Sequence, residues 1–187
     1  MIIYNDKKLK ILQCTNPVLR EKSDDVKEFD KTLSDFAKSL NKMMKDPLND
    51  GVETVGISAV QVGYKIKLCI CKNPRSGKSI AMVNPEVTDT STEQSEELEG
   101  CISVGTGANQ LFAYVPRPMR AKVKYFDLKG NENISEYGGQ MSHIVQHEID
   151  HMNGVLFIDY ISDPHDIMTL DEINEKSNRK NIHLEAI

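Results

Sequence analysis

The stretch Gln146-His147-Glu148-Ile149-Asp150-His151 decides how the rest of this chain is interpreted. It contains the pattern His-Glu-x-x-His. Residues four apart on a helix share a face, with Cβ atoms roughly 5–6 Å apart, so His147 and His151 can reach one metal ion. Glu148 would lie beside that ion without binding it and could accept a proton from a metal-bound water. The simpler interpretation is a polar helix face with two solvated histidines, so the surrounding sequence has to decide.

Length and composition bound the class of protein. The chain has 187 residues, 39% of them hydrophobic and 27% charged, which predicts a single folded domain over residues 1–187. A formal net charge of −5 argues against a nucleic-acid or anionic-membrane surface. No apolar run approaches the ~20 residues of a membrane span, and the N-terminus lacks a secretory pattern. We therefore expect a cytoplasmic protein whose four cysteines are thiols.

Apolar spacing predicts two helices. The first has an apolar stripe with a 3.6-residue period, formed by Leu33, Phe36, Ala37, Leu40, Met43 and Met44. Asp30 or Thr32 could cap its start, and Pro47 ends it and begins a polar turn. The second, over residues 138–153, carries the His-Glu-x-x-His pattern, and Gly154 ends it. The tail, residues 163–187, reads as polar and peripheral.

Strand signals lie between these helices. Alternating apolar residues predict strands at 64–71, 79–87, 120–128 and 132–136, with Cys69 and Cys71 as buried or half-buried thiols. Residues 55–63, in which small and branched residues alternate, predict a strand or bend close to another backbone. The acidic residues from 91 to 99 read as a mostly solvated face, and 104–109 as a loop.

A catalytic metal normally needs a third protein ligand. His143 cannot join His147 and His151, because imidazoles at i, i+4 and i+8 span about 12 Å of helix axis. A third histidine at the metzincin position is excluded, because Phe157 stands there.

Two kinds of third ligand remain. A zinc peptidase of the thermolysin kind would use a downstream glutamate, for which Glu172 and Glu175 are available in the tail. Cys101, which follows Gly100 beside a loop, could bind as a thiolate. A lone cysteine is more often a small buried hydrophobe, so these residues alone leave the choice open.

Three stretches that follow one another in the sequence favour Cys101 as the third ligand. They resemble the three motifs of the peptide deformylases, G-φ-G-φ-A-A-x-Q, E-G-C-φ-S and Q-H-E-x-D-H, where φ is apolar: Gly56-Ile-Ser-Ala-Val-Gln61, Glu99-Gly-Cys-Ile-Ser103 and Gln146-His-Glu-Ile-Asp-His151. The second and third motifs match fully. The resemblance covers roughly residues 10 to 160 and includes Asn84-Pro85, Val115-Pro-Arg117 and Gly154-Val-Leu-Phe-Ile-Asp159.

The resemblance implies a metal site and a fold. Cys101, His147 and His151 would bind one divalent ion, with water in the fourth position. The family metal is typically Fe²⁺, and Zn²⁺, Ni²⁺ or Co²⁺ can occupy the site. No further cofactor is implied. The fold would be α+β, with β-sheets packed around the central His-Glu-x-x-His helix and the N-terminal amphipathic helix outside.

The resemblance also implies an activity. Members remove the N-formyl group from the initiator methionine of new polypeptides and release formate. Glu148 would be the general acid and base, while Gln61 and the backbone N–H of Ile102 would stabilise the oxyanion. The partners would be nascent N-formylmethionyl peptides and, transiently, the ribosome.

The methionine side chain of such a substrate needs an apolar pocket. Candidate lining residues are Gly56, Ile57, Tyr114 and Ile144.

This chain also departs from the family pattern. Thr54 replaces the first glycine of the first motif, Ser58 replaces an alanine, and Val60 stands where proline or threonine is common. The loop Val104–Tyr114 is a few residues longer than usual and lacks the arginine that often contacts the peptide. His143 stands where arginine is common. These differences leave two alternatives: a zinc peptidase that uses a downstream glutamate, or a catalytically weak relative that binds N-terminal peptides or ribosomes.

Overall fold

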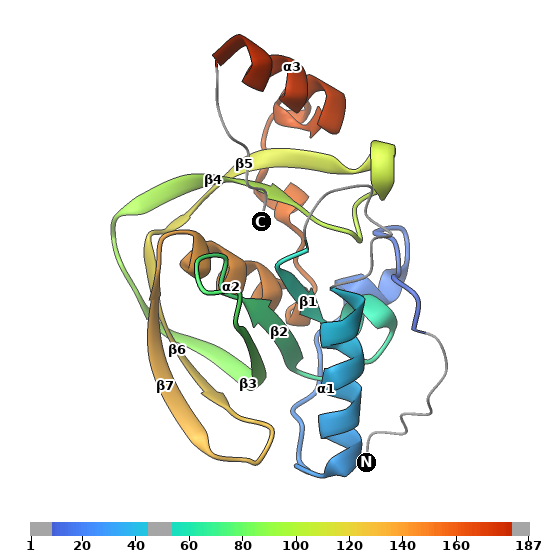
Figure 1. Ribbon diagram of the computed structural model, residues 1–187, viewed down its shortest axis with the longest axis vertical. Coiled ribbons are helices and arrows are strands. Elements are labelled where there is room, and N and C mark those ends of the chain that lie inside the picture. Colours follow the sequence, from blue (N-terminus) through green and yellow to red (C-terminus); the bar gives the residue numbers. More distant parts are fainter. Residues whose placement is uncertain (1–8, 45–53, 181–187) are drawn as a thin grey trace.

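The computed structural model describes residues 9–44 and 54–180 (Figure 1). The predicted helix stop at Pro47, the polar turn after it and the end of the tail lie outside these residues. Among the described residues, no helix is both long and apolar enough to cross a membrane.

Two antiparallel sheets and three α-helices make up the described fold, which confirms the prediction of a mixed helix-and-sheet architecture. The larger sheet has the order β1 (Gly56–Ser58), β2 (Leu68–Lys72), β3 (Ser79–Thr90), β6 (Arg120–Phe126) and β7 (Glu132–Gly138). The smaller sheet has the order β4 (Gln94–Gly100), β5 (Leu111–Pro118) and β8 (Met168–Thr169). The helices are α1 (Lys31–Met43), α2 (Gln140–Met152) and α3 (Leu170–Lys180).

The larger sheet is covered on both faces, and strand β2 shows why. Successive side chains of a strand point to opposite faces. Leu68 and Ile70 accordingly lie in the apolar cluster that contains the buried side of α1, whereas Cys69 and Cys71 lie in the cluster that contains the buried side of α2. Both cysteines are buried free thiols, as predicted. One helix therefore packs on each face of the sheet.

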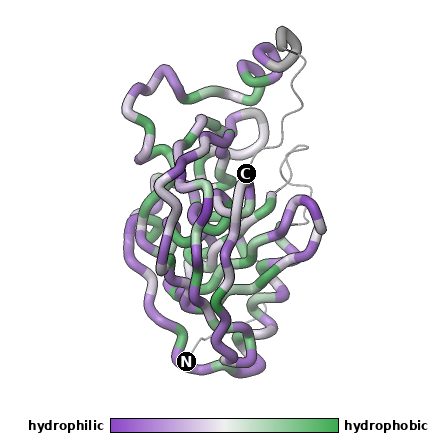
Figure 2. Tube along the Cα trace, turned by 90° about the vertical axis from the view of Figure 1, so that its left-hand side faces the viewer, coloured by the Kyte–Doolittle hydropathy of each residue, from purple (hydrophilic) through white to green (hydrophobic). Residues whose placement is uncertain are grey.

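Helix α1 begins where its sequence supplies a cap. The Asp30 side chain accepts a hydrogen bond from the Leu33 N–H at 2.9 Å, which satisfies one of the free donors at the helix start. The side chains of Leu33, Phe36 and Leu40 are fully buried. Figure 2 shows hydrophobic and hydrophilic stretches alternating along the chain, the pattern expected for elements with one buried face.

Helix α2 packs against β1, β2 and β7 of the larger sheet and against β5 of the smaller one. Nearly all of its side chains are buried, and the polar ones among them are Ser142, His143, Gln146, His147, Glu148 and His151. Buried polar groups need partners, so this concentration of them marks the functional part of the molecule.

The acidic segment contains a strand that its composition concealed. Glu93 and Glu96 are exposed, as expected of a solvated face, but Gln94–Gly100 forms β4 and pairs with β5. Glu99 is fully buried. Along β4 the side chains pass from exposed and half-buried at Gln94–Glu97 to buried at Leu98–Gly100, so the strand runs from the surface into the interior.

The predicted peripheral tail is attached to the smaller sheet. Residues Met168–Thr169 pair with Leu111 and Phe112 of β5, and Figure 1 shows α3 beyond that edge. Met168 and Ile173 are buried in a small apolar cluster with Phe112. The described part of the tail is thus more closely attached than its polar composition indicated.

Candidate metal centre

Three buried side chains meet between the two sheets. Cys101 directly follows β4, while His147 and His151 lie one turn apart on α2. Their possible ligand atoms all lie within 4.8 Å of one another, and the distance from Cys101 Sγ to His151 Nε2 is 3.3 Å. The two sheets and α2 therefore bring together residues that are far apart in the sequence.

This arrangement fits a divalent metal ion. Tetrahedral bonds of about 2.3 Å to sulfur and 2.0–2.1 Å to nitrogen place ligand atoms roughly 3.3–3.6 Å apart, close to the separation of Cys101 and His151. Burial lowers the pKa of His151 well below its usual value, so its ring is neutral. A neutral imidazole is the form that binds a metal.

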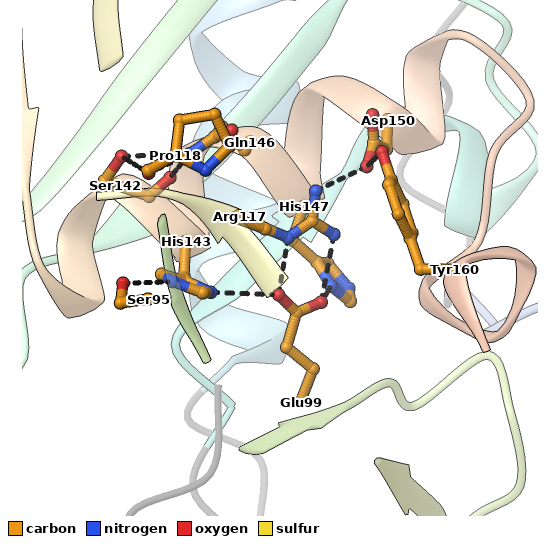
Figure 3. Close-up of polar contacts among 10 residues, drawn as sticks. All are labelled: Ser95, Glu99, Arg117, Pro118, Ser142, His143, Gln146, His147, Asp150 and Tyr160. Carbon is orange, nitrogen blue, oxygen red and sulfur yellow. Dashed lines mark hydrogen bonds and ion pairs between the residues drawn. The ribbon is translucent and has the colours of Figure 1, made fainter. Parts of the chain in front are cut away.

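Glu99 orients His147 for the same role. Its Oε2 lies 2.9 Å from His147 Nδ1, which leaves Nε2 of that ring for a metal (Figure 3). Burial alone would raise the pKa of Glu99, but hydrogen bonds from His143, His147 and Arg117 lower it far below its usual range. The carboxylate is therefore ionised, and the Nδ1 proton of His147 points toward it.

Arg117 joins the smaller sheet to α2. It donates from Nε to Glu99 Oε1 at 2.5 Å and from a terminal nitrogen to Glu99 Oε2 at 3.0 Å. Its other terminal nitrogen lies 2.7 Å from Asp150 Oδ2, an oxygen that also accepts from Tyr160. This two-point geometry on Glu99 is the strong form of an arginine–carboxylate pair. It fixes β4, β5 and α2 relative to one another around the three ligands.

His143 belongs to the same network. One ring nitrogen, Nδ1, lies 3.3 Å from Glu99 Oε1, and the other, Nε2, lies 2.9 Å from Ser95 Oγ (Figure 3). The ring is fully buried. It therefore supports Glu99 from the opposite side to His147, consistent with its rejection as a third ligand.

Glu148 lies beside the three ligands and close to β1. Ser58 Oγ lies 2.7 Å from Glu148 Oε2 and 2.9 Å from the Glu148 carbonyl oxygen. A Cβ at Gly56 would lie 2.2 Å from Glu148 Oε1, so a glycine is needed for this approach. Burial raises the pKa of Glu148 to about 7, and the hydrogen bond from Ser58 opposes that rise. The carboxyl group can thus take up and release a proton near neutral pH.

Gln61 is buried at the same site. It lies on the short 3-10 helix Ala59–Val62. Its Oε1 accepts the Ser58 N–H at 2.8 Å, so its Nε2 faces the other way, 3.4 Å from Cys101 Sγ and 3.2 Å from Ser103 Oγ. The hydrogen bond from the Ser58 N–H thus turns the Nε2 end of the Gln61 amide toward Cys101.

A cavity opens beside this cluster. Six predicted site residues line it: Gly56, Gln61, Cys101, Ile102, His147 and Glu148. The rest of the lining consists of Thr54, Val55, Gly100 and Gln110. The other three predicted pocket residues lie elsewhere. Ile57 and Ile144 are fully buried in the apolar clusters of α1 and α2, and Tyr114 is 49% exposed on β5.

Some residues of the site were not predicted. Glu99 and Arg117 lie within the stretches that carry the family resemblance, so their place in those motifs was an available signal. Ser58 counted only as a departure from the pattern, and nothing local distinguished Gln110. Their roles depend on contacts between strands and helices that are remote in sequence.

Comparisons with known proteins agree with this geometry. Residues 8–166 match the model of the family described as polypeptide deformylase. The peptide deformylase of Brucella suis biovar 1 is 39% identical over 150 residues, which cover 79% of this chain and 81% of the relative. The solved peptide deformylase of Thermotoga maritima superposes with a TM-score of 0.74 at 30% identity and covers 84% of this chain and 99% of that one. A Met-Ala-Ser-bound class I type b peptide deformylase from Acinetobacter baumannii superposes with a TM-score of 0.72 at 30% identity. It covers 82% of this chain and 98% of that one.

Proposed function

The chain belongs to the polypeptide deformylase family, and on that premise we propose that it hydrolyses N-formylmethionyl peptides at a metal ion held by Cys101, His147 and His151. The single observation that supports this site most is the convergence of the three buried ligand atoms within 4.8 Å. The products are formate and a peptide with a free N-terminus. The ion is divalent, with Fe²⁺ our first candidate and Zn²⁺, Ni²⁺ or Co²⁺ as others.

The chemistry of the ion sets what the protein has to supply. A divalent ion held by Cys101, His147 and His151 would supply positive charge and would lower the pKa of a bound water from 15.7 toward about 7. Glu148 accepts the proton of the attacking water at Oε1, because its Oε2 is held by Ser58. It then gives that proton to the leaving nitrogen. Its pKa of about 7 suits both steps.

Charge that develops on the formyl oxygen needs donors placed in advance. The Nε2–H of Gln61 and the backbone N–H of Ile102 are our candidates, and one such donor is typically worth about 3 kcal/mol in the transition state. The bond from the Ser58 N–H to Gln61 Oε1 supports this assignment, because it keeps the amide nitrogen on the side of Cys101.

The peptide lies between the two sheets in this proposal. Strand β1 ends the larger sheet and β4 ends the smaller one, and the cavity is lined from both sides, by residues 54–56 and 100–102. An extended peptide adds readily to an open strand edge, because its backbone groups complete the hydrogen bonds of that strand. Gly56, Ile57, Tyr114 and Ile144 remain our candidates for contact with the methionine, although only Gly56 lines this cavity.

We also propose that α2 is the central helix of the site, with both sheets around it and α1 outside, and that residues 1–187 form one catalytic domain. The packing of α1 and α2 on opposite faces of the larger sheet supports this arrangement. The enzyme would work in the cytoplasm on new polypeptides and contact the ribosome transiently.

The peptidase alternative is not favoured. Glu172 holds its carboxylate against the N–H and hydroxyl of Thr169, and Glu175 is exposed on α3. The ligand position next to the two histidines is filled by Cys101 instead.

Formate release from formyl-Met-Ala-Ser tests the proposed function, with protein loaded with Fe²⁺ or Ni²⁺ without oxygen. We expect wild type and Cys14→Ser to release formate and bind one metal ion, and Cys101→Ser to lose both. No release by loaded wild type at high enzyme concentration would favour the peptide-binding alternative. Unchanged metal content in Cys101→Ser would contradict the ligand assignment.

A further inference from the structure

A short N-terminal segment, residues 12–14, is hydrogen-bonded to both stretches of chain that bring donors to the cavity. The Leu12 N–H donates to the Gln61 carbonyl at 2.8 Å, and the Cys14 N–H donates to the Ser103 carbonyl at 2.7 Å. The reaction proposed above uses nothing from this segment. The segment nevertheless ties together two parts of the site that are remote from each other in the sequence.

The side chain of Gln13, in the middle of this segment, makes two further bonds. Its Nε2 donates to the Ile102 carbonyl at 3.0 Å, and its Oε1 accepts the Gly105 N–H at 3.2 Å. A reversed amide would place donor against donor and acceptor against acceptor, so both bonds depend on one orientation. Gln13 therefore holds the peptide between Ile102 and Ser103 by its carbonyl group.

That peptide is the middle one of a turn. The Val104 N–H donates to the Cys101 carbonyl at 2.8 Å, so residues 101–104 form a β-turn. The bond that closes the turn does not involve the Ile102–Ser103 peptide. This peptide is held from outside the turn instead, by the Gln13 amide.

The opposite side of the same peptide faces a proposed metal ligand. The N–H and C=O of a trans peptide point in opposite directions, and the Ser103 N–H donates to Cys101 Sγ at 3.4 Å. A hydrogen bond to the sulfur of a metal-bound cysteine tunes the metal, because it draws electron density from the sulfur. The grip of Gln13 on the carbonyl thus bears on the sulfur at the other side of the peptide.

We propose that Gln13 is a positioning residue of the metal site, whose amide holds the Ile102–Ser103 peptide so that the Ser103 N–H stays on the Cys101 sulfur. The proposal rests on the proposed function, because it takes Cys101 as a ligand of the ion. Gln13 acts only through this peptide. The peptide also includes the carbonyl of Ile102, whose own N–H is a proposed oxyanion donor, so the same contact steadies both groups.

Cobalt-loaded protein tests the contact without turnover. Co²⁺ bound to a thiolate gives a sulfur-to-metal charge-transfer band, and loss of an N–H···S bond moves this band to longer wavelength, because the sulfur holds its electrons less tightly. Gln13→Met removes both bonds of the amide. Gln13→Glu, at a pH that keeps the new carboxylate ionised, retains the acceptor for the Gly105 N–H and loses the donor to Ile102. Thr15→Ala, at an exposed neighbour, is the control.

We expect the band to move to longer wavelength in both Gln13 variants and to stay in place in Thr15→Ala. The affinity for Co²⁺ should fall roughly 3- to 10-fold in the Gln13 variants, the value of one neutral hydrogen bond. An unmoved band in Gln13→Met would overturn the proposal, even if Tm fell, because the role of Gln13 would then be structural only. A shift in Gln13→Met without one in Gln13→Glu would also overturn it, because the effect would then come from Gly105.

The proposed function fails in a different way. A cobalt-loaded wild type without the charge-transfer band would contradict Cys101 as a ligand. Absence of formate release by Fe²⁺- or Ni²⁺-loaded wild type would count against the activity and leave the cobalt comparison of the Gln13 variants in force.

Discussion

Glu99 is the residue on which the geometry of the proposed metal site most depends. Its two oxygens accept from Arg117 and lie against His143 and His147, and all four residues are buried. A buried charge that loses its partner is expensive, commonly 3–5 kcal/mol, because the remaining charge stays unpaired. Glu99 therefore stabilises the fold and orients His147, a proposed metal ligand, at the same time.

Glu99→Gln separates these contributions. We expect metal affinity to fall about 10- to 100-fold, as is typical when a partner of a metal-binding histidine is lost, and the free energy of unfolding to fall by about 3 kcal/mol. Competition with a chelator and urea unfolding measure the two effects. Glu96→Gln, on the exposed side of the same strand, is the control and should change neither. Unaltered metal affinity in Glu99→Gln would show that His147 does not need this carboxylate.

Glu148 makes the metal-free protein less stable as pH rises. Its pKa is about 7 in the folded protein, against 4.5 as the ordinary value, so the folded state binds the proton more tightly. That stabilisation is complete below about pH 4.5 and is lost as pH rises to 7, a change of about 3 kcal/mol. A buried carboxylate without its metal thus costs stability near neutral pH.

Glu148→Gln removes this titration. We expect the free energy of unfolding of the metal-free wild type to fall, relative to the variant, by up to about 3 kcal/mol between pH 4.5 and 7. Urea unfolding across this range measures the difference, and other titrating groups cancel because both proteins share them. Parallel pH curves would mean that Glu148 does not change its protonation in this window.

At the scale of elements, strand β1 and helix α2 approach each other more closely than most side chains allow. At Gly56 the space for a Cβ is already taken by the Glu148 carboxylate, and Ser58 bonds to Glu148 two residues later. The short strand therefore sets the position of the proposed general base. Thr54, in place of a glycine, lines the cavity just before it.

Gly56→Ala should displace the carboxylate while leaving the ligands in place. We expect a loss of kcat of roughly 100-fold, the order attributed to general acid–base catalysis, with metal content unchanged. Steady-state kinetics with metal analysis checks this result. Gly138→Ala is the matched control, because a Cβ there makes only ordinary contacts of 3.7 Å or more. A fully active Gly56→Ala enzyme would contradict the proposed role of Glu148 Oε1.

The elements that could be predicted are those whose signals are local. The stripe from Leu33 to Met44 predicts a helix and Asp30 its start, and α1 covers Lys31–Met43. Strand β4 escaped because its glutamates suggested a solvated segment, although one of them, Glu99, is fully buried. The place of Gln110 in the cavity lining was not predicted, because it depends on its position beside Gly100, ten residues earlier, which no spacing rule encodes. The proposed metal ligands could be named only from the motifs in combination, since a lone Cys101 favours a buried hydrophobe.

At the scale of the whole molecule, the metal should stabilise the fold. A ligand that binds only the folded state adds about 4 kcal/mol at a thousand times its dissociation constant. For a chain of this size, that corresponds to a rise in Tm of roughly 8–16 °C. Calorimetry with and without metal measures this rise in Tm. The control His165→Asn, at an exposed site, should show the same rise, and Cys101→Ser should show none. Equal Tm values for loaded and metal-free wild type would contradict a site formed only on folding.

The position of Cys101 between the sheets has a mechanical consequence. An ion bound to Cys101 on one side and to His147 and His151 on the other ties the end of β4 to α2 and closes the chain between them into a loop. A disulfide does the same by a covalent bond and restricts the unfolded chain, more so for longer loops. Here the link is reversible, so a chelator opens it without cutting or reducing the protein. The proposed metal centre would therefore also be a removable crosslink between the end of β4 and α2.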